Sequence, residues 1–135
     1  AFGVGGEDKK NSSSWILKDW EAPQIERDWG HYRELYKGEG FAVKELVINP
    51  HSSLSMQRHK HRSETWNLVS GSAHLLTSNR SEPEDPLIQK LVPANPIDIP
   101  SGVWHKGVNN SDEPAHIVEV WKGVHLTEED IERWD

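Results

Sequence analysis

Residues 57–71 have the sequence QRHKHRSETWNLVSG, which combines two histidines, a glutamate and a closing glycine. Imidazole and carboxylate groups are common protein ligands of divalent metal ions. Side chains two residues apart lie on the same face of a β-strand, so Gln57, His59 and His61 can all face one way. Glu64 has the opposite parity and reaches the same point only if a turn precedes it. The stretch predicts a metal site but leaves open which of the earlier residues are ligands.

The segments around this stretch predict an all-β fold. They are short, rich in Val, Ile, Leu or Trp, and several alternate apolar with polar residues. Sequences typical of turns, such as SG, PSG and NNSDEP, separate them. Many short strands at this spacing favour a sandwich or a barrel. The predicted strands cover residues 41–48, 64–69, 72–77, 87–92, 103–108 and 115–121.

The two ends of the chain depart from this pattern. Residues 1–24 are expected to form an N-terminal arm, polar and rich in Gly and Ser at its start, that contacts a neighbouring subunit. Residues 25–135 are expected to form one domain. Near the C-terminus, TEEDIERW (127–134) begins with Thr127 and continues with acids through Asp130, which predicts one short helix.

Composition argues against several classes of protein. A chain of 135 residues is long enough for one domain and too short for two. The net charge of −7, without a long Lys/Arg cluster, argues against a nucleic-acid partner. The absence of cysteine excludes disulfides and thiolate metal sites and fits the expected cytoplasmic location. There is no apolar run of about 18 residues, so no membrane association is expected.

A histidine outside the opening stretch strengthens the metal hypothesis. His105 lies in PSGVWHKGVNN (100–110), at the start of another predicted strand. Eight histidines in the chain make a chance pairing within HKH plausible. A glutamate at a fitting offset, together with a histidine after a Pro-x-Gly turn, nevertheless favours a divalent metal site.

These motifs resemble the two conserved motifs of the cupins. The second motif fits at Pro100, Gly102, His105 and Asn109, with Ala94 in the position of its opening glycine. Cupins fold as a double-stranded β-helix, a jelly-roll-like barrel, which agrees with the strands predicted above. The resemblance therefore implies a cupin domain over residues 25–135 that ends in a short helix.

In the first motif, the resemblance decides between the alternative ligand pairs. The cupin spacing, counted back from Glu64, places the pair at Gln57 and His59, with His51 in the position of the opening glycine. The pair His59 and His61 would leave too few residues before Glu64. His61 then becomes an extra residue near the metal. The ligands that the resemblance implies are Gln57, His59, Glu64 and His105.

A narrower resemblance points to one group of cupins. The Gln-x-His pair is similar to that of phosphomannose isomerases, and LSMQRHKHRSETW looks like the isomerase domain of the type II mannose-6-phosphate isomerase/mannose-1-phosphate guanylyltransferases. The guanylyltransferase domain lies outside this match, so no nucleotide chemistry is implied. The other matching segments are RDWGHY (27–32), GFAVKELVINP (40–50), IPSGVWH (99–105) and LTEEDIERWD (126–135).

The implied function is a metal-dependent isomerase that interconverts mannose 6-phosphate and fructose 6-phosphate or a similar pair. This reaction requires a cation near the reacting oxygens, a proton carrier and a phosphate anchor. Zinc is favoured by the family likeness, although the ligand set also suits manganese, cobalt or iron. The expected catalytic residues are His61, Lys44 and Arg133, and the other candidates for sugar-phosphate binding are Arg62 and Lys106.

Two other functions stay open at this point. A cupin with different metal chemistry, such as an oxygenase, is disfavoured by Gln57, because redox cupins more often have a His-x-His pair. A non-catalytic sugar-binding module would bind its ligand without metal. The resemblance also implies a homodimer formed through edge strands, because the unpaired backbone groups of an exposed edge strand favour contact with another chain.

Overall fold

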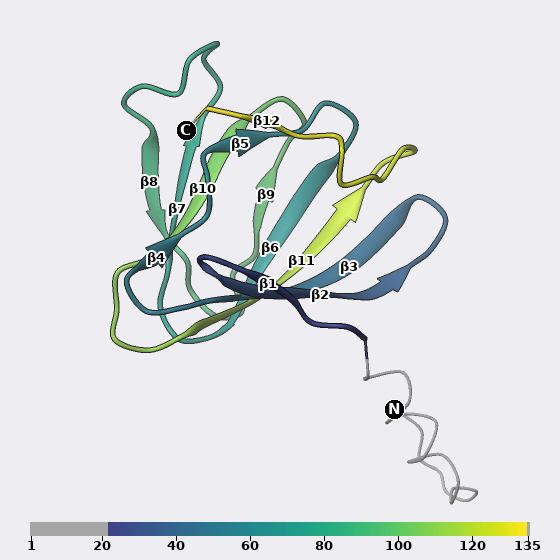
Figure 1. Cartoon of the computed structure of the whole chain (residues 1–135). Helices are drawn as coiled ribbons and strands as arrows, with labels where there is room; N and C mark the ends of the chain where they lie inside the picture. Colours follow the sequence, from purple (N-terminus) through teal and green to yellow (C-terminus); the bar gives the residue numbers. More distant parts are fainter. Residues whose placement is uncertain (1–21, 135) are drawn as a thin grey trace, which may run out of the picture.

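The computed structural model describes residues 22–134 as two antiparallel β-sheets that enclose a shared core (Figure 1). The first sheet contains, in spatial order, β1 (Ile25–Arg27), β2 (Gly30–Lys37), β3 (Phe41–Ile48), β11 (Ala115–Lys122), β6 (Ser63–Ser70) and β9 (Ile97–Ile99). The second contains β12 (Glu132–Arg133), β5 (Gln57–Arg58), β10 (Trp104–Asn109), β7 (His74–Ser78) and β8 (Leu87–Lys90), with β4 (Ser52–Ser53) paired to β10.

The all-β prediction is confirmed. Each of the six predicted strands is present, with ends that differ by no more than two residues from those expected. Of the strands that the sequence did not reveal, β2 has eight residues, β1 and β9 have three each, and β4, β5 and β12 have two each. A segment this short shows no alternation, so only pairing with a neighbour defines it as a strand.

Alternation within the long strands separates an apolar from a charged part of the interior. Leu46 and Ile48 of β3 and Ile117 of β11 are buried in the main core. Further along the same inward-facing rows, ionisable side chains replace apolar ones. Lys44 of β3 and Glu119 of β11 lie directly opposite each other in the strand register and are both buried.

The helix predicted over residues 127–134 is wrong. Asp130 N donates to Thr127 O at 3.4 Å, which forms a single turn, and the chain then pairs as β12 with β5. The Asp130 carboxylate accepts backbone N–H groups of another segment, so it does not cap a helix. Eight residues form few internal helical hydrogen bonds, and pairing with β5 satisfies the backbone better.

Two turns adopt the left-handed conformation at positions where the cupin motifs have glycine. His51 has φ 55° and Ala94 has φ 66°. Gly71, the last residue of the opening stretch, has φ 86°, and a Cβ there would lie 2.2 Å from Pro114 O. Glycine is therefore required at position 71, whereas His51 and Ala94 carry conformational strain.

The expectations about subunit contacts are not tested by these observations. Residues 1–21 of the predicted N-terminal arm lie outside the described residues. The edge strand β8 exposes both Leu87 and Ile88, and the homodimer stays a prediction. Within residues 22–134, no helix is long and apolar enough to cross a membrane.

We expect Ala94→Gly to raise the free energy of unfolding by about 0.5–1 kcal/mol. Relief of the left-handed strain, about 1–2 kcal/mol, exceeds the entropy that glycine adds to the unfolded chain, about 0.4–1 kcal/mol. Urea unfolding monitored by tryptophan fluorescence measures the change. Ser101→Gly is the control, because Ser101 is exposed, as Ala94 is, but has no left-handed φ. The control substitution should lower the free energy of unfolding. Equal destabilisation by both variants would contradict this account.

Candidate metal centre

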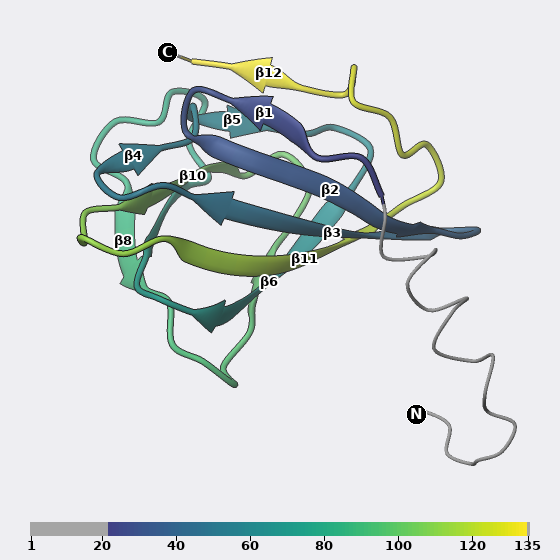
Figure 2. The same ribbon diagram turned by 60° about the horizontal axis from the view of Figure 1, so that its bottom comes forward.

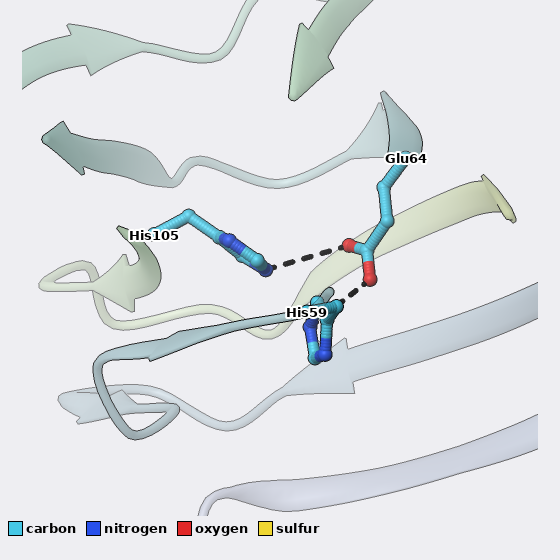
Figure 3. A group of neighbouring side chains, drawn as sticks. All are labelled: His59, Glu64 and His105. Carbon is cyan, nitrogen blue, oxygen red and sulfur yellow. Dashed lines mark ion pairs between the residues drawn. The ribbon is translucent and has the colours of Figure 1, made fainter. Parts of the chain in front are cut away.

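Three buried side chains from separate segments converge at the charged end of the interior. His59 follows β5, Glu64 lies at the start of β6 and His105 at the start of β10. His59 Nε2 lies 3.3 Å from Glu64 Oε2, and His105 Nε2 lies 3.5 Å from Glu64 Oε1. Figure 3 shows the three side chains pointing toward one another, with one carboxylate oxygen facing each imidazole.

Backbone carbonyls determine which nitrogen of each imidazole carries the proton. His59 Nδ1 lies 2.7 Å from Asp130 O, and His105 Nδ1 lies 3.0 Å from Val103 O. A carbonyl can only accept, so each Nδ1 must donate. The lone pair of a neutral imidazole is then on Nε2, which faces Glu64. This arrangement is typical of histidines that bind metals.

The protonation states also suit a cation. Burial lowers the pKa of the His59 imidazole to about 4, and nearby Arg62 and His105 act in the same direction. Burial alone would raise the pKa of the Glu64 carboxyl, but His105, Arg62 and His59 outweigh it and lower that pKa to about 2. Near neutral pH, His59 is therefore neutral and Glu64 is ionised, as metal ligands must be.

The spacing of the three groups fits one divalent ion. Ligand atoms at about 2.0–2.2 Å from an ion, at tetrahedral angles, lie about 3.3–3.6 Å apart. The two distances to Glu64 match this range, each to a different carboxylate oxygen, and one ligand atom from each of the three residues lies within 4.8 Å of the others. Arg62 occupies one of the ligand atoms, because its Nη2 lies 3.1 Å from His59 Nε2. Metal binding requires Nη2 to leave that nitrogen, while Arg62 Nε can keep its 2.8 Å bond to Glu64 Oε2.

Gln57 lies beside this cluster. It is paired with His105 in the register of β5 and β10. Its amide nitrogen donates to Ser55 O and Ser55 Oγ, both at 3.2 Å, which leaves the amide oxygen for another partner. Gln57 lines the same cavity as Glu64 and His105. Its role as a fourth ligand stays a prediction.

A cavity of about 410 Å³ opens beside the cluster and is large enough for a small ligand. Lys44 is on its wall, with the ammonium in contact with Glu128 and 3.8 Å from the centre of the Trp121 ring. The Arg62 guanidinium lies 3.3 Å from the centre of the same ring. The predicted site residues that line the cavity are Lys44, Gln57, Arg62, Glu64, His105 and Arg133.

Three predicted residues do not line this cavity. His59 contacts both Arg62 and Glu64, which line the cavity, but does not line it itself. His61 is exposed in a separate hollow, where its ring meets His125 edge-on at 5.9 Å. Lys106 follows His105 in β10, so its side chain points to the opposite face of the sheet. His61 and Lys106 therefore lie outside the cavity, although each is close in sequence to a candidate ligand.

Sequence reasoning missed Glu119, a buried acid on the cavity wall. Burial, reinforced by Glu64, raises the pKa of its carboxyl, and Trp121 Nε1 donates to Glu119 Oε1 at 2.8 Å. A signal was available in AHIVEVW, because Glu119 occupies an inward position between Ile117 and Trp121. An acid in an apolar row of a strand marks a candidate site residue.

Comparisons with known proteins agree on one family. A family model described as "Mannose-6-phosphate isomerase C-terminal" matches residues 18–135. The xanthan biosynthesis protein XanB of Xanthomonas campestris pv. campestris (strain B100) is 33% identical over 93% of the chain. The alginate biosynthesis protein AlgA of Pseudomonas aeruginosa is 31% identical over 98%. The chain spans only 24% and 28% of these two relatives, about a quarter of their length.

Solved structures show the same fold at low identity. Oxalate decarboxylase from Bacillus subtilis superposes on 84% of the chain, and the chain covers 30% of that protein, with a TM-score of 0.72 and 18% identity. The capsular polysaccharide assembling protein CapF from Staphylococcus aureus gives a TM-score of 0.71 and 18% identity over 84% of the chain and 34% of that protein. The cupin fold, a double-stranded antiparallel barrel, is thereby confirmed.

His59 should make the metal-free protein less stable as the pH falls. Its folded pKa of about 4 lies below the ordinary 6.5, so the unfolded chain takes up the proton first. The stabilisation that neutral His59 gives the folded protein is complete above about pH 6.5 and is lost as the pH falls to about 4. The difference between these pKa values corresponds to about 3 kcal/mol at most.

Urea unfolding with a chelator at about pH 7 and about pH 4.5 tests this pH dependence. His59→Gln should lose much less stability over this range than the wild type. The variant comparison is necessary because Glu119, whose pKa is raised, contributes stability with the opposite pH dependence. Equal losses in both proteins would contradict the assignment to His59.

Proposed function

The chain belongs to the family of mannose-6-phosphate isomerase C-terminal domains, and from this we propose that it is a metal-dependent sugar-phosphate isomerase. The proposed reaction interconverts mannose 6-phosphate and fructose 6-phosphate, or a similar aldose–ketose pair. The observation that carries the proposal is the buried cluster of His59, Glu64 and His105 beside a cavity with acidic and basic groups.

The isomerisation moves two protons between neighbouring positions of the sugar. One passes from C2 to C1, and the other passes from the oxygen on C2 to the oxygen on C1. A divalent ion at the cluster would supply positive charge beside these two oxygens. We favour zinc for this role, with Gln57 as the fourth ligand.

Lys44 is the proposed proton carrier together with Glu128. The Lys44 ammonium contacts the Glu128 carboxylate and is only 3% exposed, whereas Glu128 is 59% exposed at the cavity. Within this pair, the Glu128 carboxylate can accept the proton from C2, and the Lys44 ammonium can donate a proton to C1 and recover one from the Glu128 carboxyl. His61 is not proposed for this role, because it lies in another hollow.

Glu119 is proposed to bind a sugar oxygen. With its pKa raised by burial, its carboxyl group can stay protonated and donate a hydrogen bond. Such a donor would orient the substrate while negative charge develops on its oxygens. Trp121 would hold the carboxyl in place through the bond from Nε1 to Oε1.

The substrate phosphate is proposed to bind at the exposed rim of the cavity. Arg133 of β12 lines this rim and is exposed. Arg62 is less suitable, because its guanidinium already contacts Glu64, His59 and Thr127 O. A guanidinium that carries no such contacts can bind two phosphate oxygens at once.

The purified protein should contain one divalent ion per chain and interconvert mannose 6-phosphate and fructose 6-phosphate. Chelation should abolish the activity, and zinc should restore it. Gln57→Ala should lower metal retention about 10-fold or more, because it removes one proposed ligand. His61→Ala is the matched control from the same stretch and should keep the metal.

Elemental analysis and a coupled isomerase assay give these results. Full metal occupancy without turnover on a set of hexose and pentose phosphates would contradict the isomerase proposal. Oxygen uptake by an iron-loaded protein would instead support an oxygenase. Sugar binding that survives chelation would support a non-catalytic module.

Arg133→Ala should raise the KM for the sugar phosphate about 10-fold or more, with a smaller effect on kcat, because it removes a charge that binds the phosphate. Lys106→Ala removes the same charge from the opposite face of β10 and should leave KM within about twofold. Steady-state kinetics at constant ionic strength provide the comparison. A larger KM effect for Lys106→Ala would place the phosphate elsewhere.

A further inference from the structure

Residues 127–134, the C-terminal strap, lie against the segment that carries the candidate ligands. Figure 2 shows the chain leading into β12 and β12 itself along one side of the molecule, beside β5. The strap also supplies Glu128, Ile131 and Arg133 to the cavity wall. It is the segment for which the sequence predicted a helix.

Asp130 connects the strap to residues 59–61 through three hydrogen bonds. Its backbone oxygen accepts from His59 Nδ1 at 2.7 Å. Its Oδ1 accepts from Lys60 N and its Oδ2 from His61 N, both at 2.9 Å. The carboxylate thus fixes the main chain around His59, and the carbonyl fixes the ring of His59.

The strap touches the surroundings of two more candidate ligands. Arg133 is paired with Gln57 in the register of β12 and β5. Thr127 O accepts from Arg62 Nη1 at 3.3 Å, and Arg62 Nε in turn donates to Glu64. The strap is therefore linked directly or through one residue to Gln57, His59 and Glu64.

We propose that Asp130 is a positioning residue for the metal centre. It holds the His59 imidazole with its proton on Nδ1 and with the lone pair of Nε2 directed at Glu64. This inference rests on the proposed metal-binding role of His59. A neutral imidazole has two tautomers, and only the one protonated on Nδ1 leaves Nε2 able to bind a cation. A carbonyl 2.7 Å from Nδ1 accepts a proton and cannot supply one, so it selects that tautomer.

The Asp130 carboxylate matters because it anchors this carbonyl. Without the bonds to Lys60 N and His61 N, Asp130 would lose the anchor of its side chain, while the rest of the strap would keep the β12–β5 pairing, the Lys44–Glu128 and Arg58–Glu132 ion pairs and the bond from Trp134 N to Met56 O, at 2.9 Å. The carbonyl would then move relative to the imidazole. Loss of such an outer partner typically lowers metal affinity by about 10–100-fold.

The first test determines the tautomer of His59 in the metal-free full chain. Long-range nitrogen–proton NMR correlations of the labelled protein distinguish the two tautomers. The wild type should show His59 protonated on Nδ1. Asp130→Ala should show a mixture of the two tautomers, and Asp130→Asn should be intermediate because its amide nitrogen cannot accept an N–H. Glu129→Ala is the matched control, because the Glu129 side chain is exposed and forms none of these bonds.

The second test measures cobalt(II) affinity by competition with a chelating dye. Asp130→Ala should bind about 10–100-fold more weakly than the wild type, whereas Glu129→Ala should stay within about twofold. If Asp130→Ala does not fold, judged by its urea unfolding curve, Asp130→Asn decides. Wild-type tautomer and wild-type affinity in a folded Asp130 variant would overturn the proposal.

Neither measurement requires substrate, so the results separate the two proposals. A tautomer change and weaker cobalt binding in a protein without isomerase turnover would overturn the isomerase proposal and support the role of Asp130. Metal-dependent turnover, together with Asp130 substitutions that leave the His59 tautomer and cobalt(II) affinity unchanged, would support the isomerase proposal and overturn the role of Asp130. A wild-type protein that binds no cobalt(II) would overturn both.

Discussion

The carboxylate of Glu64, ionised and buried inside the barrel, determines much of the arrangement around it. A buried charge is unstable unless hydrogen bonds and opposite charges compensate for its lost hydration. Trp66 Nε1 donates to Oε1 and Arg62 Nε to Oε2, both at 2.8 Å, while one imidazole faces each oxygen. Loss of one partner of such a group typically costs about 3–5 kcal/mol. A divalent ion could take part in the same compensation.

The rest of the interior is organised around this charge. The inward rows of β3, β6 and β11 change from apolar residues to Lys44, Glu64 and Glu119 without any break in the strands. Trp121 provides a ring surface for two cations, Lys44 and Arg62, and so keeps positive charge near the carboxylates. Charged side chains thus lie on rigid strands, and the strap completes the wall of the cavity on one side.

Residue pattern predicted the fold well and the site in part. Alternation revealed the long strands other than β2. The position of the glutamate in residues 57–71 and the histidine after a Pro-x-Gly turn indicated Glu64 and His105, and the cupin spacing added His59. The helix over the strap was wrong, because local capping signals cannot show that Asp130 binds the backbone of residues 60 and 61. Lys106 lies on the opposite face from His105 because neighbouring residues of a strand alternate, a local rule that the choice of Lys106 did not follow. Glu119 was missed because both alternating rows of β11 contain apolar residues, so the burial of the row with Glu119 is evident only in the structure.

The sequence by itself determined the strands, the turns and the chemical types of the candidate ligands, because alternation, turn residues and histidine–glutamate spacing are local properties of the chain. Only the tertiary structure decided which imidazole faces Glu64, which nitrogen carries the proton and where the strap lies. These features depend on contacts between segments about 70 residues apart, such as His59 and Asp130. No local pattern records such a contact, because it exists only where β12 lies beside β5.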